Sequence, residues 1–204
     1  MSTVRYSFGV DRRTNYLETA LRLFLEHGFN GVSMDQLVAE AGGSKATLYR
    51  YFASKEALFD AIIDDIATQA TPSGTEDDWN RVDLEEGLRL LCRATAAGAL
   101  DERTTVIFRL AVGEHSRFPN LARTLFEQGP GRTYERLKRF LAAKQTEGVV
   151  AIDDLQIAAE QFLGGIVGHQ QLRAALGVGA PTAADIDARI DAAVRSFMAT
   201  YSTG

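Results

Sequence analysis

Cysteine is nearly absent from this sequence: the 204 residues contain one, Cys92. A single cysteine forms no disulfide within the chain, which excludes a fold stapled by disulfides. Cys92 lies in an apolar helical run beside Leu90 and Leu91. We therefore interpret it as a buried structural thiol, with a redox sensor as the less favoured alternative.

Long hydrophobic runs are also missing. The sequence has no apolar stretch of eighteen residues, and its N-terminus lacks the apolar segment of a signal peptide. We therefore expect no membrane partner and a cytoplasmic location.

Histidine is scarce and scattered, at His27, His115 and His169. The sequence contains no H-E-x-x-H, no P-loop and no G-x-S-x-G. With one cysteine and no paired ligands at helical spacing, a metal site is not expected either. We predict no catalytic site, no metal and no cofactor, and we interpret His27 as a helix C-terminal residue favoured by the macrodipole.

The alternation typical of β-strands is absent, and helical periodicity runs along the chain. The prediction is an all-α fold of about nine helices, with a break at Thr71–Thr75. Gly129, Pro130 and Gly131 are predicted to close one helix, and Asp153 with Gln156 to open another as a capping box. The predicted helices after the first one span about 34–41, 45–51, 54–70, 84–99, 102–112, 119–128, 132–147, 153–176 and 182 to the end.

The segment from Val32 to Phe59, VSMDQLVAEAGGSKATLYRYFASKEALF, is typical of a helix-turn-helix. Ser33 with Gln36 has the spacing of a capping box, so a short helix should begin at Met34. Glycines 42 and 43 adopt positive φ cheaply and allow a turn. Ser44 then caps a second short helix, which is the candidate reader, and Ser54 caps a third, longer one.

The second short helix offers DNA-binding chemistry. Leu48 and Phe52, four residues apart, can face the core, which leaves Lys45, Thr47 and Tyr49 exposed near the end that enters the major groove. Hydroxyl and ammonium donors mostly bind phosphates, whereas lysine and arginine can also reach guanine. The predicted phosphate donors are Ser33, Thr47, Tyr49 and Lys55, and the predicted base readers are Lys45 and Arg50.

The net charge of −5 is unevenly distributed. Residues 1–55 hold 7 Lys and Arg against 5 Asp and Glu, whereas the remainder holds 15 against 22. The positive part of the chain is therefore the predicted DNA-binding part. An acidic remainder weakens non-specific attraction to the duplex, so affinity should depend strongly on salt.

From about Arg12 to Ile63 the sequence resembles the N-terminal domain of the TetR family of transcriptional regulators. The resemblance rests on the amphipathic first helix, the HGF turn at 27–29, the VSM start and the LYRYFxSKEALF block. Gly43 departs from the family, which usually has a branched aliphatic residue there, and this difference is expected to loosen the turn or shift the reader helix. The resemblance and the exposure pattern together give the predicted DNA-binding set as Ser33, Ser44, Lys45, Ala46, Thr47, Tyr49, Arg50, Tyr51 and Lys55; for Tyr51, a partly buried aromatic is an equal alternative.

Residues 111–131 resemble the C-terminal domain of the AefR-like branch, through Glu114, Arg117, Phe118 and Pro119. A small-molecule pocket is expected between the fifth to eighth predicted helices, because aromatic side chains with a few polar groups are typical of such sites. Plain core packing is the alternative for the aromatics, and an ion pair for Glu114 and Arg117. The predicted ligand-binding residues are Phe108, Glu114, His115, Arg117, Phe118, Phe126, Phe162 and His169.

The last two long helices are predicted to mediate dimerisation. The final helix repeats Ile186, Ile190, Ala193 and Phe197, and the preceding one carries small residues; the alternative is that both complete the monomer core. The resemblance implies residues 1–58 as a DNA-binding domain and 59–204 as an effector and dimerisation domain. It further implies a homodimer on a palindromic double-stranded DNA operator, released by an unknown small-molecule effector. A helical adaptor of the same fold without operator binding is the alternative function.

Overall fold

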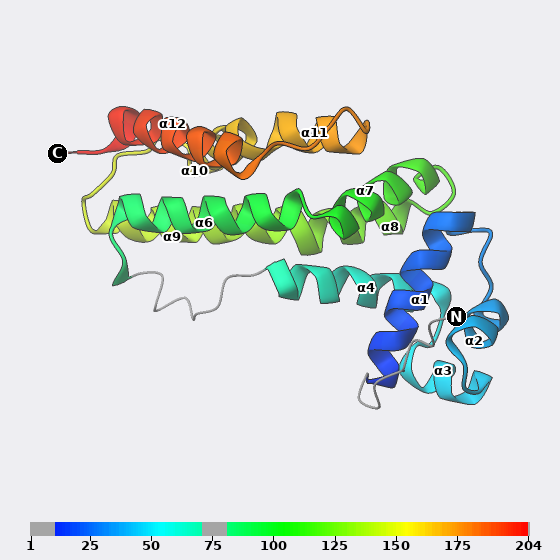
Figure 1. The fold of residues 1–204 in the computed structure, drawn as a ribbon. Helices are drawn as coiled ribbons and strands as arrows, with labels where there is room; N and C mark the ends of the chain where they lie inside the picture. Colours follow the sequence, from blue (N-terminus) through cyan, green and yellow to red (C-terminus); the bar gives the residue numbers. More distant parts are fainter. Residues whose placement is uncertain (1–10, 71–80, 204) are drawn as a thin grey trace.

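The structure is a computed structural model that describes residues 11–70 and 81–203 (Figure 1). The all-α prediction is confirmed. The described residues form nine continuous helices, two of which carry two α labels each because a short π-helical segment joins α8 to α9 and α10 to α11. Their only β pairing is an isolated bridge between Val150 and Ser202. The predicted break at Thr71–Thr75 lies outside the described residues. Within the described ranges, no helix has the length and apolar content needed to cross a membrane.

Four helices build the N-terminal part: α1 (Arg12–His27), α2 (Met34–Ala41), α3 (Lys45–Tyr51) and α4 (Lys55–Ala70). The serine caps are where the sequence predicted them. The Ser33 hydroxyl accepts from the Gln36 amide at 3.2 Å, and the Ser44 hydroxyl accepts from the Thr47 amide at 3.1 Å. Ser54 accepts from the Ala57 amide at 3.1 Å. These bonds satisfy amides that the first helical turns leave free, which fixes where α2, α3 and α4 begin.

The C-terminal part is layered (Figure 1). A middle layer of α6, α7, α8 and α9 lies between α4 on one side and α10, α11 and α12 on the other. The bounds are α6 (Leu84–Ala99), α7 (Glu102–Glu114), α8 (Pro119–Phe126), α9 (Arg132–Thr146), α10 (Leu155–Leu163), α11 (His169–Ala175) and α12 (Ala183–Tyr201).

The predicted helix end at Gly129–Gly131 is wrong. A π-helical segment, Glu127–Gly131, joins α8 to α9 with Pro130 inside it. In a regular α-helix the proline ring would collide with the carbonyl four residues earlier. The wider π turn relieves that collision, so the chain continues as one bent helix.

The predicted capping box at Asp153 is also wrong by one residue. Asp154 caps α10, accepting from the amides of Gln156 at 2.9 Å and Ile157 at 3.0 Å. The Gln156 side chain donates instead to Glu160 at 2.5 Å. A second π segment, Gly164–Gly168, joins α10 to α11, so the predicted long helix ends near its expected position.

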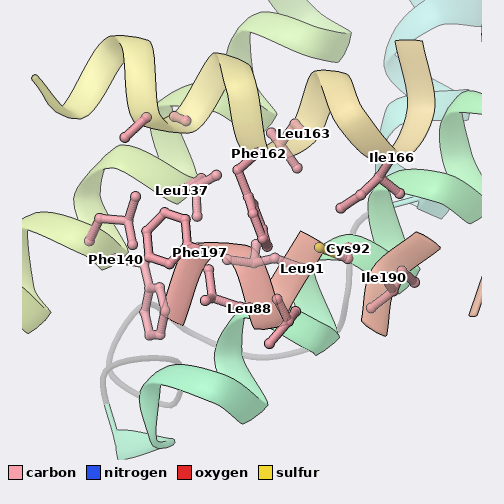
Figure 2. Close-up of a cluster of buried hydrophobic side chains, with 14 of the residues drawn as sticks. Leu88, Leu91, Cys92, Leu137, Phe140, Phe162, Leu163, Ile166, Ile190 and Phe197 are labelled. Carbon is pink, nitrogen blue, oxygen red and sulfur yellow. The ribbon is translucent and has the colours of Figure 1, made fainter. Parts of the chain in front are cut away.

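Buried apolar side chains form two separate cores. The N-terminal core contains residues of α1 to α4 together with Ile107 of α7 and Leu121 of α8. The C-terminal core contains residues of α6, α9, α10, the second π segment and α12 (Figure 2). Two helices from beyond residue 100, α7 and α8, therefore contribute to the core of the N-terminal part.

Cys92 lies inside the C-terminal core with its side chain fully buried (Figure 2). Burial raises the pKa of its thiol to about 12, with Arg89 and Arg93 opposing the shift weakly. The thiolate is the reactive form, and it is nearly absent at pH 8. We expect no labelling by iodoacetamide at pH 8 in the folded protein and full labelling in guanidinium, measured by mass spectrometry. Comparable labelling rates in both states would contradict the buried assignment.

Candidate nucleic-acid interface

The exposed face of α3 is the first element of the site. Leu48 is fully buried and Phe52, at the helix end, is 3% exposed, so these two side chains anchor α3 in the N-terminal core. The opposite face carries the exposed side chains of Lys45, Ala46, Tyr49 and Arg50. Ser44 and Thr47 share a 2.8 Å hydroxyl contact at the N-terminus of the helix. Lys45 and Tyr49 are exposed as the sequence predicted, whereas Thr47, which was also predicted to be exposed, is half-buried.

Lys45 has a partner that the sequence analysis did not identify. Its ammonium lies 2.6 Å from the carboxylate of Asp35 on α2, and both side chains are exposed. The hydrogen bond and charge of Asp35 raise the lysine pKa. Because water screens an exposed pair, we assign it little weight in folding. Its consequence is local: one positive charge of the reading face is partly offset before DNA arrives.

Lys55 holds the loop between α1 and α2. Its ammonium donates to the carbonyls of Phe29 at 2.7 Å and Val32 at 2.8 Å, and lies 4.5 Å from the centre of the Phe29 ring. Partial burial lowers its pKa, with Glu56 and Glu114 opposing the shift. The phosphate contact of Lys55 stays a prediction; in this structure the ammonium satisfies two carbonyls of the helix connection.

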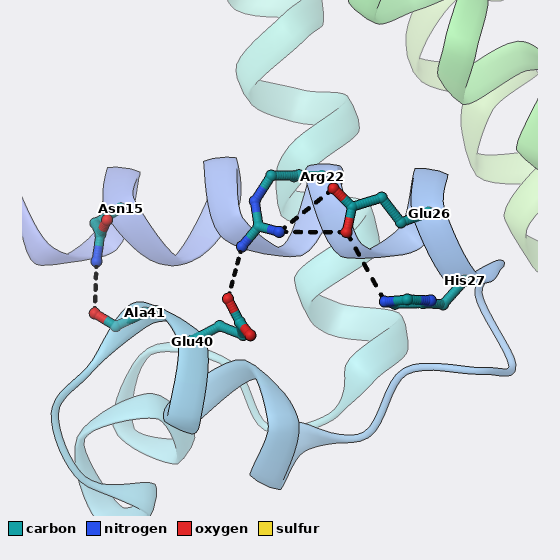
Figure 3. A network of polar contacts seen from close by, with 6 residues as sticks. All are labelled: Asn15, Arg22, Glu26, His27, Glu40 and Ala41. Atoms are coloured by element: carbon teal, nitrogen blue, oxygen red, sulfur yellow. Dashed lines mark hydrogen bonds and ion pairs between the residues drawn. The ribbon is translucent and has the colours of Figure 1, made fainter.

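The turn before α3 is fixed from α1. The Asn15 amide donates to the carbonyl of Ala41 at 2.9 Å (Figure 3), and the Tyr16 hydroxyl donates to that of Gly42 at 3.3 Å. Arg22 adds an ion pair to Glu40 of α2 at 3.0 Å. The looser turn expected from Gly43 is therefore countered by bonds from a neighbouring helix. Sequence reasoning missed Asn15 and Tyr16 because their partners are carbonyls that only folding brings near.

Gly43 has φ +101°, and a Cβ built there would lie 2.7 Å from the Tyr16 hydroxyl. Both the backbone conformation and the space therefore require glycine.

Tyr51 lies at the edge of the site. It is 38% exposed, and its ring centroid is 6.2 Å from that of Tyr16 and 6.1 Å from that of Phe52. The Arg50 guanidinium lies over the Tyr51 ring, with Cζ 5.4 Å from the ring centroid. Both alternatives for Tyr51, a structural aromatic and a DNA contact, fit this position.

The residues of the predicted ligand pocket are dispersed. Phe118 packs against Phe29 in the N-terminal core, with ring centroids 4.8 Å apart. Phe162 packs against Phe197 in the C-terminal core, with ring centroids 5.1 Å apart. Phe126 is 59% exposed. His115, Arg117 and His169 are also exposed, while Phe108 and Glu114 are half-buried. These eight residues do not converge on one site.

Glu114 and Phe118 instead connect the two parts of the molecule. A Cβ built at Gly28 would lie 3.1 Å from a Glu114 carboxylate oxygen, so this carboxylate lies against the loop after α1. Phe118 reaches the same loop through Phe29. The corner between α7 and α8 therefore packs on the loop that Lys55 holds.

A capped reading helix, docked on α1 in an all-helical N-terminal core, defines a helix-turn-helix transcriptional regulator. The chain belongs to the TetR family. Residues 17–62 match the family model described as bacterial regulatory proteins of the tetR family, and residues 86–203 match the AefR-like transcriptional repressor C-terminal domain. Both resemblances predicted from the sequence are confirmed.

Curated relatives agree. An uncharacterised HTH-type transcriptional regulator of Mycobacterium tuberculosis is 36% identical over 118 residues, which are 57% of this chain and 54% of that protein. The matched region thus spans about half the length of that relative. HTH-type transcriptional repressor ComR of Escherichia coli is 42% identical over 48 residues, 24% of this chain and 23% of ComR.

Solved structures extend the similarity to nearly the whole chain. Flavonoid-responsive regulator FrrA superposes with a TM-score of 0.77 and 34% identity, covering 94% of this chain and 97% of FrrA. A TetR-family regulator from Mesorhizobium loti superposes with a TM-score of 0.76 and 25% identity, covering 97% and 100%. Both of these solved structures are named as regulators.

Proposed function

We propose that this protein is a sequence-specific operator-binding regulator that reads the major groove with α3. The proposal rests on the exposed face of α3, where Lys45, Tyr49 and Arg50 lie together. The opposite face of this helix is held in the core by the buried Leu48 and Phe52. Tyrosine and serine hydroxyls suit phosphates, and Arg50 suits a guanine edge. Helices α2 and α3 form a helix-turn-helix, the motif whose second helix lies in the major groove of bound DNA.

A homodimer is proposed from the outward face of α10 and α11. The apolar stripe of α12 is already used within the monomer, where Ile190, Val194 and Phe197 are buried. Two small residues of the preceding helix, in contrast, lie on the outside. Gly165 and Gly168 are exposed, and a Cβ built at either meets nothing within 4 Å. Small residues with exposed apolar neighbours suit close approach of a second copy. Those neighbours are Ile157, Leu172 and Leu176.

A repressor released by a small-molecule effector is the regulatory mode we propose. Among the described residues, two buried side-chain oxygens have no hydrogen-bond partner, Thr104 Oγ1 on α7 and Gln128 Oε1 in the π segment. Both elements contact α4. An unpaired buried polar atom is costly, and a ligand hydroxyl or amide would satisfy it. Because α4 begins at the reading domain, an effector bound there would change the spacing of the two reading heads.

The name of FrrA motivates the first compounds to test, since it describes a flavonoid-responsive regulator. Flavonoids combine an aromatic body with several hydroxyls, and a hydroxyl can donate to each of the two unpaired oxygens. The test is a thermal-shift screen of the protein with a flavonoid panel, followed by release of bound duplex. Stabilisation without any change in duplex affinity would argue against the effector role.

The test of operator binding begins with selection of bound duplexes from a random pool at physiological salt. Tyr49→Phe removes one exposed hydroxyl and is expected to weaken the selected duplex about fivefold, uniformly across base variants, because a phosphate bond is lost. Fluorescence anisotropy measures the affinity. Tyr134→Phe on α9 is the matched control and should bind as the wild type does.

The helical adaptor remains the alternative function. It would be supported if the pool yielded no enriched sequence and Tyr49→Phe left weak binding unchanged. An enriched palindrome, with half-sites about one turn or a multiple apart, would exclude it.

A further inference from the structure

The first turn of α1 carries two adjacent arginines that helix stability does not explain. Arg12 and Arg13 are its first two residues, and that turn contains no acidic side chain. Cations at a helix N-terminus oppose the macrodipole. The cap residue Asp11 accepts from the Arg13 amide at 3.3 Å, which satisfies the backbone and offsets part of the charge. The two guanidinium groups therefore weaken the helix that carries them.

Both arginines lie against the reading helix. Arg12 Nη1 is 3.5 Å from the position of a Cβ at Gly43, in the turn that precedes α3. Arg13 Cζ is 5.8 Å from the centre of the Phe52 ring, at the residue that ends α3. The arginine pair thus flanks both ends of α3, and the N-terminal end of α1 lies beside α3 (Figure 1).

Within the described part of the chain, the guanidinium groups of both arginines are free of carboxylate and carbonyl partners, unlike the ammonium groups of Lys45 and Lys55. Lys45 is paired with Asp35, and Lys55 donates to two carbonyls. In contrast, no carboxylate of residues 11–70 or 81–203 forms an ion pair with Arg12 or Arg13. Among the described residues, Arg12, Arg13 and Arg50 are therefore the cations beside α3 that neither pair with a carboxylate nor donate to backbone carbonyls.

The position of the pair is fixed before DNA binds. Asn15 and Tyr16, one turn further along α1, donate to carbonyls of the turn between α2 and α3. These bonds set the register of α1 on the reading unit, so the arginines enter any complex at a defined place beside α3. A guanidinium forms two parallel bonds to a phosphate, which suits this role better than an ammonium.

We propose that Arg12 and Arg13 bind backbone phosphates of the duplex that α3 reads, on the strand bordering the turn at Gly43. The inference rests on the proposed operator binding and adds α1 to the interface. The arginine pair positions the protein on the duplex and carries no base preference, because its partners are phosphates. The phosphate-binding charge that the sequence assigned to Lys55 is supplied from α1.

The experiment measures salt dependence. Wild type and Arg12→Gln/Arg13→Gln are titrated by anisotropy with the selected duplex at several salt concentrations. The variant should bind at least about tenfold more weakly, because two charge-assisted contacts are lost. The slope of log affinity against log salt should fall in magnitude by about two, and the ranking of base variants should not change. The single variants should each lower the slope by about one.

The matched control is Arg123→Gln/Arg136→Gln, which removes the same charge from the helix formed by α8 and α9. It should leave the slope unchanged, and circular dichroism should show that both double variants remain folded. An unchanged slope for Arg12→Gln/Arg13→Gln, or an equal decrease in the control, would overturn the inference. Failure of the wild type to bind duplex would instead overturn the proposed function, which keeps the two results separate.

Discussion

Phe118→Ala is expected to lower the free energy of unfolding by about 3 kcal/mol, because the ring fills the N-terminal core from outside the DNA-binding segment. The ring centroids of Phe118 and Phe29 are 4.8 Å apart in a T-shaped arrangement, and Phe29 is fully buried among other aromatic rings. Removing Phe118 leaves a cavity next to the loop that Lys55 holds. Chemical denaturation at one fixed protein concentration measures the change, since dimerisation would otherwise alter apparent stability.

Phe126→Ala is the matched control for this experiment. It removes the same side chain eight residues later, where the ring is 59% exposed, and should change stability by no more than about 0.5 kcal/mol. Equal losses in the two variants would contradict the assignment of Phe118 to the N-terminal core. The unequal result would show that α7 and α8 complete the core of the reading unit.

Gly43→Ala is expected to destabilise the protein by about 3 kcal/mol, the sum of backbone strain and a collision. The residue has φ +101°, and the new methyl group would lie 2.7 Å from the Tyr16 hydroxyl. Moving that hydroxyl breaks its bond to the carbonyl of Gly42. Because this turn leads directly into α3, affinity for the selected duplex should fall as well.

A double-mutant cycle with Tyr16→Phe separates the two causes. Tyr16→Phe alone should cost about 1 kcal/mol, for one hydrogen bond. The double variant should be more stable than additivity predicts by about 1 kcal/mol, because the hydroxyl is no longer in the way. Strict additivity would assign the whole cost of Gly43→Ala to the backbone. Gly42→Ala, with φ +73° and nothing within 4 Å of the new methyl, gives the cost of backbone strain alone.

Local signals determined much of this protein from the sequence. The caps at Ser33, Ser44 and Ser54, the glycine turn and the spacing of Leu48 and Phe52 involve residues within a few positions of one another. Such interactions are specified by residues a few positions apart, so helix starts and the exposed face of α3 were predictable from local sequence. The family motifs in the same segment then identified the class of regulator.

Predictions from local sequence were wrong at two helix ends, where the same residues are compatible with more than one local structure. Gly129–Pro130–Gly131 has the composition of a helix end, yet a π turn carries the helix through it. Asp153 and Asp154 are adjacent candidates for one cap, and the backbone selected the second. In both cases the competing local structures are close in free energy, so packing of α8 to α10 decides between them.

Only the tertiary structure decided which distant groups meet. The motif indicated a phosphate role for Lys55, and only the fold shows that its ammonium also donates to carbonyls of a loop more than twenty residues earlier. Phe118 and Phe162 shared one predicted pocket, but they belong to two different cores. No neighbouring residue in the sequence marks Arg12 as functional, and only the fold places its side chain beside Gly43. The physical reason is common to all three: periodicity tells which face of a helix is apolar, whereas the partner of that face depends on how helices far apart in the chain pack together.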